Sequence, residues 1–192
     1  MTNVLKPTYP LETPRLRLRP FTLGDLTAFH AIYSRPDVVR YLYTEPLDLD
    51  GARESLERKK TGRTELREEG DALCLAVERR DTGELIGDCM LRWASEAHSG
   101  GEIGWVFDPA HHGHGYATEA ARELLRLGFA EMRLHRIHAS CDARNTASAR
   151  MMERLGMRRE AHLVENEFVK GEWTDEFVYA LLRREWEAGR PS

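Results

Sequence analysis

Hydrophobic and polar residues alternate along several short segments of the chain, and this alternation predicts strands. Leu16 and Leu18 alternate with three arginines between residues 12 and 20, as on a strand with one buried and one exposed face. Runs of similar composition predict further strands at residues 72–78, 84–93, 103–107, 136–141, 158–164 and 173–184. Turn-forming residues separate several of them, so we expect a mostly antiparallel sheet.

Apolar residues spaced three to four apart predict helices between these strands. Thr22 begins the first helix, because Asp25 follows three residues later as in a capping box, and Pro36 ends it. A second helix begins at Asp48 or Asp50 and runs into a charged segment.

Two later segments of the chain are also predicted to be helical. One runs from about Tyr116 to about Met132, and the other runs from Asn145 to Leu155 with Gly156 as its C-cap. The mixture of helices and strands indicates an α/β (α+β) fold.

Length, composition and net charge limit the classes of protein to which this chain can belong. A chain of 192 residues with 41% hydrophobic and 31% charged residues is typical of one globular domain, which we place at residues 1–192. No apolar run approaches membrane-spanning length, and residues 1 to 10 read as a lead-in without a signal pattern, so we expect a cytoplasmic protein. A net charge of −4 gives no basic excess, so we expect no direct nucleic-acid binding.

Cysteine and histidine spacing gives no support for a metal centre. The chain has three cysteines, which lie far apart in apolar runs: Cys74, Cys89 and Cys141. We interpret them as small buried hydrophobic residues rather than as a disulfide framework, a zinc site or a catalytic thiol. His111, His112 and His114 lie close together, but no carboxylate or thiol has a fitting spacing, so we expect no metal.

A glycine-rich loop joins the strand 103–107 to the helix that begins at Tyr116. Pro109 ends the strand, and Gly113 and Gly115 flank His114. The first amides of a helix have no intrahelical partner and carry the positive end of the helix dipole, while glycine lets a ligand approach the backbone. The backbone N–H groups of residues 113 to 118 are therefore candidate phosphate donors, although an ordinary strand–helix turn would have the same pattern.

Three segments resemble one known family. They are Asp-Pro-x-x-x-Gly-x-Gly-Tyr-Ala-Thr-Glu-Ala at residues 108–120, the Asn-x-x-Ser…Leu-Gly-Met segment at residues 145–157, and Thr-Pro-Arg-Leu-Arg-Leu-Arg-Pro at residues 13–20. In their order along the chain, these segments resemble the GNAT superfamily of N-acetyltransferases over about residues 11–184. The most similar branch contains RimJ and RimL, which acetylate the N-termini of ribosomal proteins. The chain departs from that pattern at His112, where the family often has Trp, Arg or Gln, and at Met157, where it has Phe.

The resemblance implies a fold and a cofactor. The fold is a GNAT-like mixed, mostly antiparallel sheet with helices on both faces and central strands that splay to admit acetyl-CoA. The backbone of the strand 103–107 pairs with the pantetheine arm and polarises the thioester carbonyl, the glycine loop binds the pyrophosphate, and Asn145 holds the arm through its amide. The implied cofactor-binding residues are Trp105, Val106, Phe107, His112, Gly113, His114, Gly115, Tyr116, Ala117, Thr118 and Asn145.

The resemblance also implies catalytic roles. Similarity to RimL-type enzymes places Ser148 near the sulfur, where its hydroxyl protonates the leaving thiolate, and gives Glu160 the role of general base. Glu102 is the second candidate for the base, and Asp175 and Glu176 are weaker ones. Read from the residues alone, Ser148 could equally be a surface residue beside an N-cap, and Glu160 an exposed carboxylate on a strand.

The expected reaction is acetyl transfer from acetyl-CoA to a primary amine, with a protein N-terminal α-amine as the first choice. The alternatives are a small-molecule amine (a polyamine, an amino acid or an aminoglycoside), a longer acyl donor such as succinyl-CoA, and a non-catalytic CoA-binding module. The sequence leaves the oligomeric state open, a homodimer included.

Overall fold

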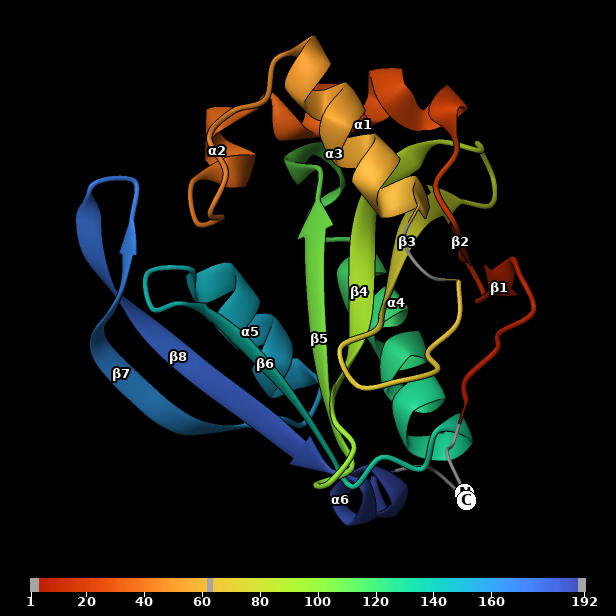
Figure 1. The fold of residues 1–192 in the computed structure, drawn as a ribbon, viewed down its shortest axis with the longest axis vertical. Coiled ribbons are helices and arrows are strands. Elements are labelled where there is room, and N and C mark those ends of the chain that lie inside the picture. The colour runs from red at the N-terminus through yellow and green to blue at the C-terminus, as the bar shows by residue number, and fades with distance from the viewer. Residues whose placement is uncertain (1–3, 62–63, 190–192) are drawn as a thin grey trace.

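A computed structural model describes residues 4–61 and 64–189 of the chain. Among these residues, eight strands form one sheet in the order β1-β2-β3-β4-β5-β6-β8-β7 (Figure 1). The strands are β1 (Leu11–Glu12), β2 (Leu16–Arg19), β3 (Ala72–Arg79), β4 (Leu85–Ser95), β5 (Gly100–Phe107), β6 (Arg136–Asp142), β7 (Arg158–Val169) and β8 (Glu172–Leu182). The helices are α1 (Leu26–Tyr33), α2 (Pro36–Val39), α3 (Leu49–Thr61), α4 (Tyr116–Arg126), α5 (Thr146–Arg154) and α6 (Arg183–Ala188).

The sheet is mixed and mostly antiparallel, as predicted. Each pair of neighbouring strands is antiparallel except β5 and β6, which run parallel. A parallel pair needs a crossover connection, and α4 supplies it.

The parallel pair separates soon after it forms. Its register joins Gly100 to Arg136, Gly101 to Ile137 and Glu102 to His138, and the two strands then diverge (Figure 1). Strand β5 continues to Phe107, which still pairs with Gly87 on β4. Along residues 103–107 the side of β5 that faces β6 therefore has no strand partner among the described residues. The predicted splay of the central strands is confirmed.

Helices cover both faces of the sheet, which also confirms the prediction (Figure 1). On one face, Leu124 of α4 and Met152 of α5 belong to a buried cluster with Ile103 and Ile137. On the other face, α1 and α3 form a second cluster that covers β3 and β4 only towards one end of the strands. Apolar side chains on both faces explain why the central strands read as nearly continuous hydrophobic runs. No helix in the described parts of the chain is both long enough and apolar enough to cross a membrane.

The first helical segment differs in detail from the prediction. The capping box is present, since the Thr22 amide donates to Asp25 at 2.7 Å, but it begins a short 3-10 turn at Leu23–Asp25, and α1 follows it. Pro36 separates two helices and also starts the second, because proline fits the first helical turn, where an N–H has no partner.

The C-terminal part of the chain holds one element that the sequence analysis missed. Helix α6 begins directly after β8, and the Glu185 carboxylate accepts the Leu182 amide at 2.8 Å as its cap. Strand β7 is also longer than predicted and reaches Val169, where a turn at Lys170 and Gly171 begins β8. The two strands form a long hairpin that extends away from the rest of the sheet (Figure 1).

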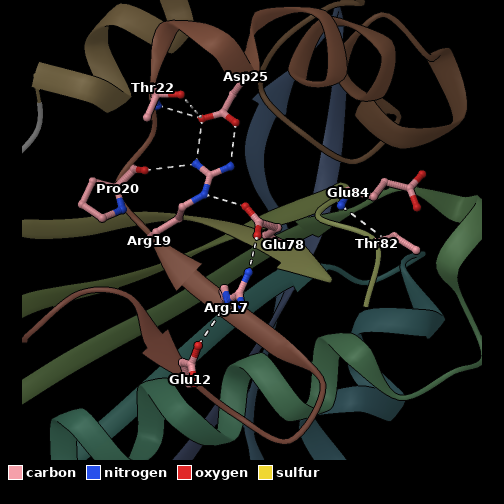
Figure 2. A network of polar contacts seen from close by, with 9 residues as sticks. All are labelled: Glu12, Arg17, Arg19, Pro20, Thr22, Asp25, Glu78, Thr82 and Glu84. Atoms are coloured by element: carbon pink, nitrogen blue, oxygen red, sulfur yellow. Dashed lines mark hydrogen bonds and ion pairs between the residues drawn. The ribbon is translucent and has the colours of Figure 1, made fainter. Parts of the chain in front are cut away.

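An ion-pair network ties β2 to its neighbours. Figure 2 shows the Arg19 guanidinium between Asp25, with contacts of 2.8 and 2.9 Å, and Glu78 of β3, at 2.9 Å. Arg17 joins Glu78 to Glu12 beside it. Burial opposes ionisation of Asp25, but hydrogen bonds from Arg19 and from the Thr22 amide outweigh it and hold the pKa of Asp25 below its usual value. The network fixes the start of α1 against the sheet.

Candidate active site

The glycine loop takes the predicted path from strand to helix. Asp108 follows β5, and its side chain accepts the Ala110 amide at 2.9 Å. Gly113 and Gly115 both have a φ of +79°, a left-handed conformation that residues with a Cβ adopt rarely. Gly115 is the N-cap of α4, so the first amides of that helix directly follow the loop. A Cβ on Gly113 would point into open space, because no protein atom lies within 4 Å of its position.

The loop borders a cavity of about 590 Å³. The lining includes most of the cofactor-binding residues that the sequence implied, together with Ser148: Trp105, Val106, Phe107, His112, Gly113, Gly115, Tyr116, Ala117, Thr118, Asn145 and Ser148. His114 is the exception among the predicted residues, because it does not line the cavity. Its backbone oxygen accepts Arg15 Nη1 at 2.9 Å, and its ring Nδ1 lies 2.9 Å from the His112 oxygen.

The cavity also collects two arginines from one face of α5. Arg150 and Arg154 are one helical turn apart, and both line the cavity. Neither forms an ion pair within the described residues, so both charges are available to an anionic ligand. The cavity therefore has amide donors on one wall and guanidinium groups on another, a combination that suits phosphate groups.

The N-terminus of α5 brings Asn145 and Ser148 together. Asn145 is the N-cap, and its Oδ1 accepts the Ser148 amide at 3.1 Å. Both residues are half-buried and line the cavity, so the capping role of Asn145 and a role in the site are compatible.

A second cavity, of about 510 Å³, adjoins the first. The two share six lining residues, which lie where β5 and β6 separate: Tyr41, Leu42, Trp105, Val106, Asn145 and Ser148. Two molecules bound in the two cavities would therefore meet beside the Ser148 side chain.

The second cavity is acidic. Its lining holds seven acidic side chains, Asp88, Glu102, Asp142, Glu167, Glu172, Asp175 and Glu176, and four basic ones, Arg40, Lys59, Arg144 and Lys170. Arg144 pairs with Asp142 at 2.7 Å and with Glu172 at 2.8 Å. Lys170 donates to a backbone oxygen rather than to an acid.

Tyr43 also lines this cavity, and its hydroxyl contacts one of the carboxylates. The hydroxyl donates to Glu167, and Glu176 accepts a hydrogen bond from the neutral Asn166 amide at 2.7 Å. Partial burial and the Glu167 hydrogen bond raise the pKa of Tyr43, and the charges of Glu167, Glu176 and Glu102 raise it further. Since Glu167 and Glu176 have neutral partners, their negative charge remains available to a cation.

The floor of the second cavity holds a buried ion pair. Asp88 is 5% exposed and accepts hydrogen bonds from Tyr33 Oη at 2.6 Å and Lys59 Nζ at 2.9 Å. Burial lowers the pKa of Lys59, but the Asp88 charge more than offsets it, so the pKa lies above its usual value. The pair joins α1, α3 and β4 beneath the cavity.

The structure does not bring Glu160 to the site. Strand β7 shifts register between Arg159 and Ala161, so Glu160 is an extra residue in a bulge. Its carboxylate lies 2.8 Å from Arg136 and 2.5 Å from Arg158, and it lines neither cavity. The role of base came from the resemblance to RimL-type enzymes, and a resemblance in sequence does not show where a bulge falls in the strand.

Other acidic candidates do line the second cavity. Glu102 contacts Arg92 of β4, and Asp175 pairs with His162 at 2.7 Å. Glu176 has no cationic partner among the described residues. The sequence analysis missed Tyr43, Glu167 and the pair of Lys59 with Asp88, which come from segments far apart in the chain. No local pattern marks such contacts.

The histidines and cysteines make separate contacts. His111 lies 3.3 Å from Glu84, and His112 Nε2 lies 3.3 Å from the Phe107 oxygen. No group of three or more potential metal ligands occurs within the described residues. Cys89 is fully buried, and burial raises the pKa of Cys141 to about 11, so its thiol stays protonated at neutral pH.

Comparison with known proteins supports the arrangement. The acetyltransferase (GNAT) domain family matches residues 15–158 of the chain. The chain is 35% identical to the uncharacterized N-acetyltransferase YnaD of Bacillus subtilis over 176 residues. The matched residues cover 92% of this chain and 98% of that protein. The chain is 25% identical over 161 residues to the spermidine N(1)-acetyltransferase of Vibrio cholerae, covering 84% and 89% of the two proteins. The crystal structure of an acetyltransferase of the GNAT family from Bacillus anthracis superimposes with a TM-score of 0.81 at 33% identity, covering 91% of this chain and 98% of that one.

Proposed function

The chain belongs to the GNAT acetyltransferase family, and from this membership we propose that it transfers an acetyl group from acetyl-CoA to a primary amine of a small, multiply cationic molecule. The family fixes the reaction type, N-acetyl transfer. The acceptor is a property of this chain's own second cavity, and the acidic lining of that cavity carries the proposal.

The residues of the first cavity fit acetyl-CoA. The amides that follow Gly113 would hold the pyrophosphate, Arg150 and Arg154 would meet phosphate charge, and the open side of β5 would pair with the pantetheine amides. The left-handed glycines support this assignment, because a Cβ at Gly113 would fill the space that a phosphate needs. When bound, acetyl-CoA supplies the activated thioester.

In this proposal the protein positions the two reactants and moves two protons. The amine nitrogen forms a bond to the acetyl carbon while the carbon–sulfur bond breaks. The Ser148 hydroxyl donates a hydrogen bond or a proton to the leaving sulfur, and a carboxylate of the second cavity accepts the proton that the amine loses, directly or through water. Glu102 lines that cavity and is the candidate acceptor of this proton.

The acidic cavity favours an acceptor with more than one ammonium group. One amine must lose its proton to react, while a second ammonium can stay charged against Glu167 and Glu176. A free amino acid fits less well, because its carboxylate would be repelled by these residues. The relative from Vibrio cholerae is named for a polyamine acceptor, spermidine, which has this chemistry.

A protein N-terminal α-amine is the second candidate. The resemblance of residues 108–120 and 145–157 to the RimJ and RimL branch favours it. However, the Tyr43–Glu167 and Lys170–Val39 hydrogen bonds join two segments that contribute to the second cavity's lining, and an extended peptide would have to pass them.

The experiment is to measure free-thiol release from acetyl-CoA with diamines, polyamines, aminoglycosides, amino acids and N-terminal peptides. We expect the highest kcat/KM with a polyamine, and we expect Glu176→Gln to raise the KM for that amine about tenfold at low salt. Asp81→Asn is a matched control, because it removes a carboxylate that lines neither cavity.

Each of the other possible results of this experiment would support one of the alternative functions. Turnover with peptides only, unchanged in Glu176→Gln, would replace the polyamine with a protein α-amine. Turnover that appears only with succinyl-CoA would replace the acetyl donor. Binding of acetyl-CoA without turnover of any acceptor would favour a non-catalytic CoA-binding module.

A further inference from the structure

The side chain of Arg15, at the start of β2, reaches across to the glycine loop. Its Nη1 donates to the backbone oxygen of His114 at 2.9 Å, and its Nε donates to Glu119 at 2.7 Å. The guanidinium carbon also lies 4.7 Å from the ring centroid of Tyr116, within cation–π range. One side chain therefore contacts the middle of the loop, the first residue of α4 and its first turn.

Glu119 receives three hydrogen bonds from the start of β2. Its Oε1 accepts the Thr13 hydroxyl at 2.6 Å and the Arg15 amide at 2.8 Å, and its Oε2 accepts Arg15 Nε. Burial opposes ionisation, but the hydrogen bonds from Thr13 and Arg15 outweigh it and lower the pKa of Glu119. The carboxylate also lies in the first turn of α4, where the helix dipole favours a negative charge.

These contacts restrain the part of the loop whose own sequence leaves the backbone most flexible. His114 lies between two glycines, and glycine allows many more backbone conformations than other residues. A loop that must be ordered when a ligand binds lowers the affinity for that ligand. The hydrogen bond from Arg15 to the His114 oxygen fixes the peptide between the glycines, so the following amides keep one orientation.

Arg15 is exposed to solvent and does not line the phosphate cavity. Its Nη2 is 3.6 Å from the position that a Cβ on Gly115 would occupy. The side chain therefore acts on the loop through its contacts with His114 and Glu119 rather than as a direct ligand.

We propose that Arg15 and Glu119 form a latch that pre-organises the glycine loop for the pyrophosphate, so that both are positioning residues for the acyl donor. The proposal rests on the proposed acetyl-CoA site. It predicts that loss of the latch weakens binding of donors that carry a pyrophosphate and leaves smaller donors unaffected.

The test compares acetyl-CoA with S-acetylpantetheine, which has the same thioester and pantetheine arm but no pyrophosphate. In Arg15→Gln we expect the KM for acetyl-CoA to rise about tenfold, as for a lost charge-assisted hydrogen bond, with kcat almost unchanged. The kcat/KM for S-acetylpantetheine should stay at the wild-type value. If Arg15 has only a structural role, the variant should lower kcat/KM equally for the two donors. Alternatively, its melting temperature should fall while KM and kcat change together.

Matched variants separate the latch from a general loss of charge. Arg17→Gln removes an arginine from the same strand that contacts Glu12 and Glu78 instead of the loop (Figure 2), and we expect no change in the KM for acetyl-CoA. Arg15→Lys keeps the charge but cannot bridge Glu119 and His114 in the same way, so it should restore the KM only in part. Glu119→Gln should raise the KM, and the double variant with Arg15→Gln should add little to either single change.

Calorimetric titration with CoA gives a readout that does not depend on turnover. If wild-type protein binds CoA without acetylating any amine, the proposed reaction fails, but a weaker CoA affinity in Arg15→Gln still supports the latch. Equal CoA affinity in wild type, Arg15→Gln and Glu119→Gln would overturn the latch while leaving the reaction in place. If wild-type protein binds no CoA, both proposals fail.

Discussion

The Nζ atom of Lys170 lies 2.7 Å from the backbone oxygen of Val39. This hydrogen bond joins the tip of the β7–β8 hairpin to the end of α2, two elements far apart in the sequence (Figure 1). The Tyr43–Glu167 hydrogen bond is a second contact between the residues that follow α2 and this hairpin.

We predict that Lys170→Met loosens the hairpin, because methionine keeps the length of the side chain but cannot donate to Val39. Amide hydrogen exchange should become faster at the hairpin tip and in residues 39–43, and stay unchanged in β3 and β4. Lys60→Met is the control, since Lys60 contacts Glu57 on its own helix. Equal exchange rates in wild type and Lys170→Met would show that the hydrogen bond to Val39 does not restrain the hairpin.

Ser148→Ala should lower kcat by about 100-fold, because the leaving thiolate loses its proton donor. The dissociation constant of acetyl-CoA should change little, since the loop and α5 arginines are untouched. Thr146→Ala removes an exposed hydroxyl from the same helix and should leave kcat unchanged. A wild-type kcat in Ser148→Ala would remove this side chain from the mechanism.

Gly115→Val should weaken acetyl-CoA binding by at least about tenfold, because a side chain at a φ of +79° strains the loop and moves its amides. Gly70→Val tests strain alone, since Gly70 has a φ of +96° in a turn and neither it nor its hydrogen-bond partner Trp93 lines either cavity. Both variants should lower the melting temperature, but only Gly115→Val should change the affinity measured by calorimetry. The loop assignment fails if the two variants bind equally well.

Glu160→Gln should retain wild-type kcat, because this carboxylate lies between Arg136 and Arg158 and outside both cavities. Its loss should change the free energy of unfolding little, since the ion pairs are partly exposed. Steady-state kinetics beside Glu176→Gln would check this directly. A large fall in kcat in Glu160→Gln alone would restore the role that the sequence suggested.

Asp25→Asn should lower the free energy of unfolding by about 2 kcal/mol at pH 7, because Arg19 and the Thr22 amide bind the carboxylate. The pKa of Asp25 is lowered in the folded protein, so its contribution is present above the unfolded pKa of about 3.9 and is lost as the pH falls below it. Urea unfolding should therefore separate wild type from the variant at pH 7 and much less at pH 3. Asp37→Asn, at an exposed ion pair with Arg35, should show a much smaller dependence, because solvent screens that pair.

The sequence predicted the features that depend on local constraints. Alternation at Leu16 and Leu18 located β2, and the glycines at 113 and 115 located the loop, because a left-handed backbone requires them. The Asn145 cap and Ser148 followed from spacing on one helix. The location of the protein in the cell, its oligomeric state and its division into domains stay predictions.

Only the tertiary structure decided which carboxylates line the second cavity. Side chains alternate between the faces of a strand, so one bulge reverses the orientation of everything beyond it. The bulge at Glu160 takes that residue away from the site, and a second irregularity between Leu163 and Glu167 brings Glu167 against Tyr43. The acidic cavity is built by such contacts between distant segments, and no local pattern in the sequence records which segments meet.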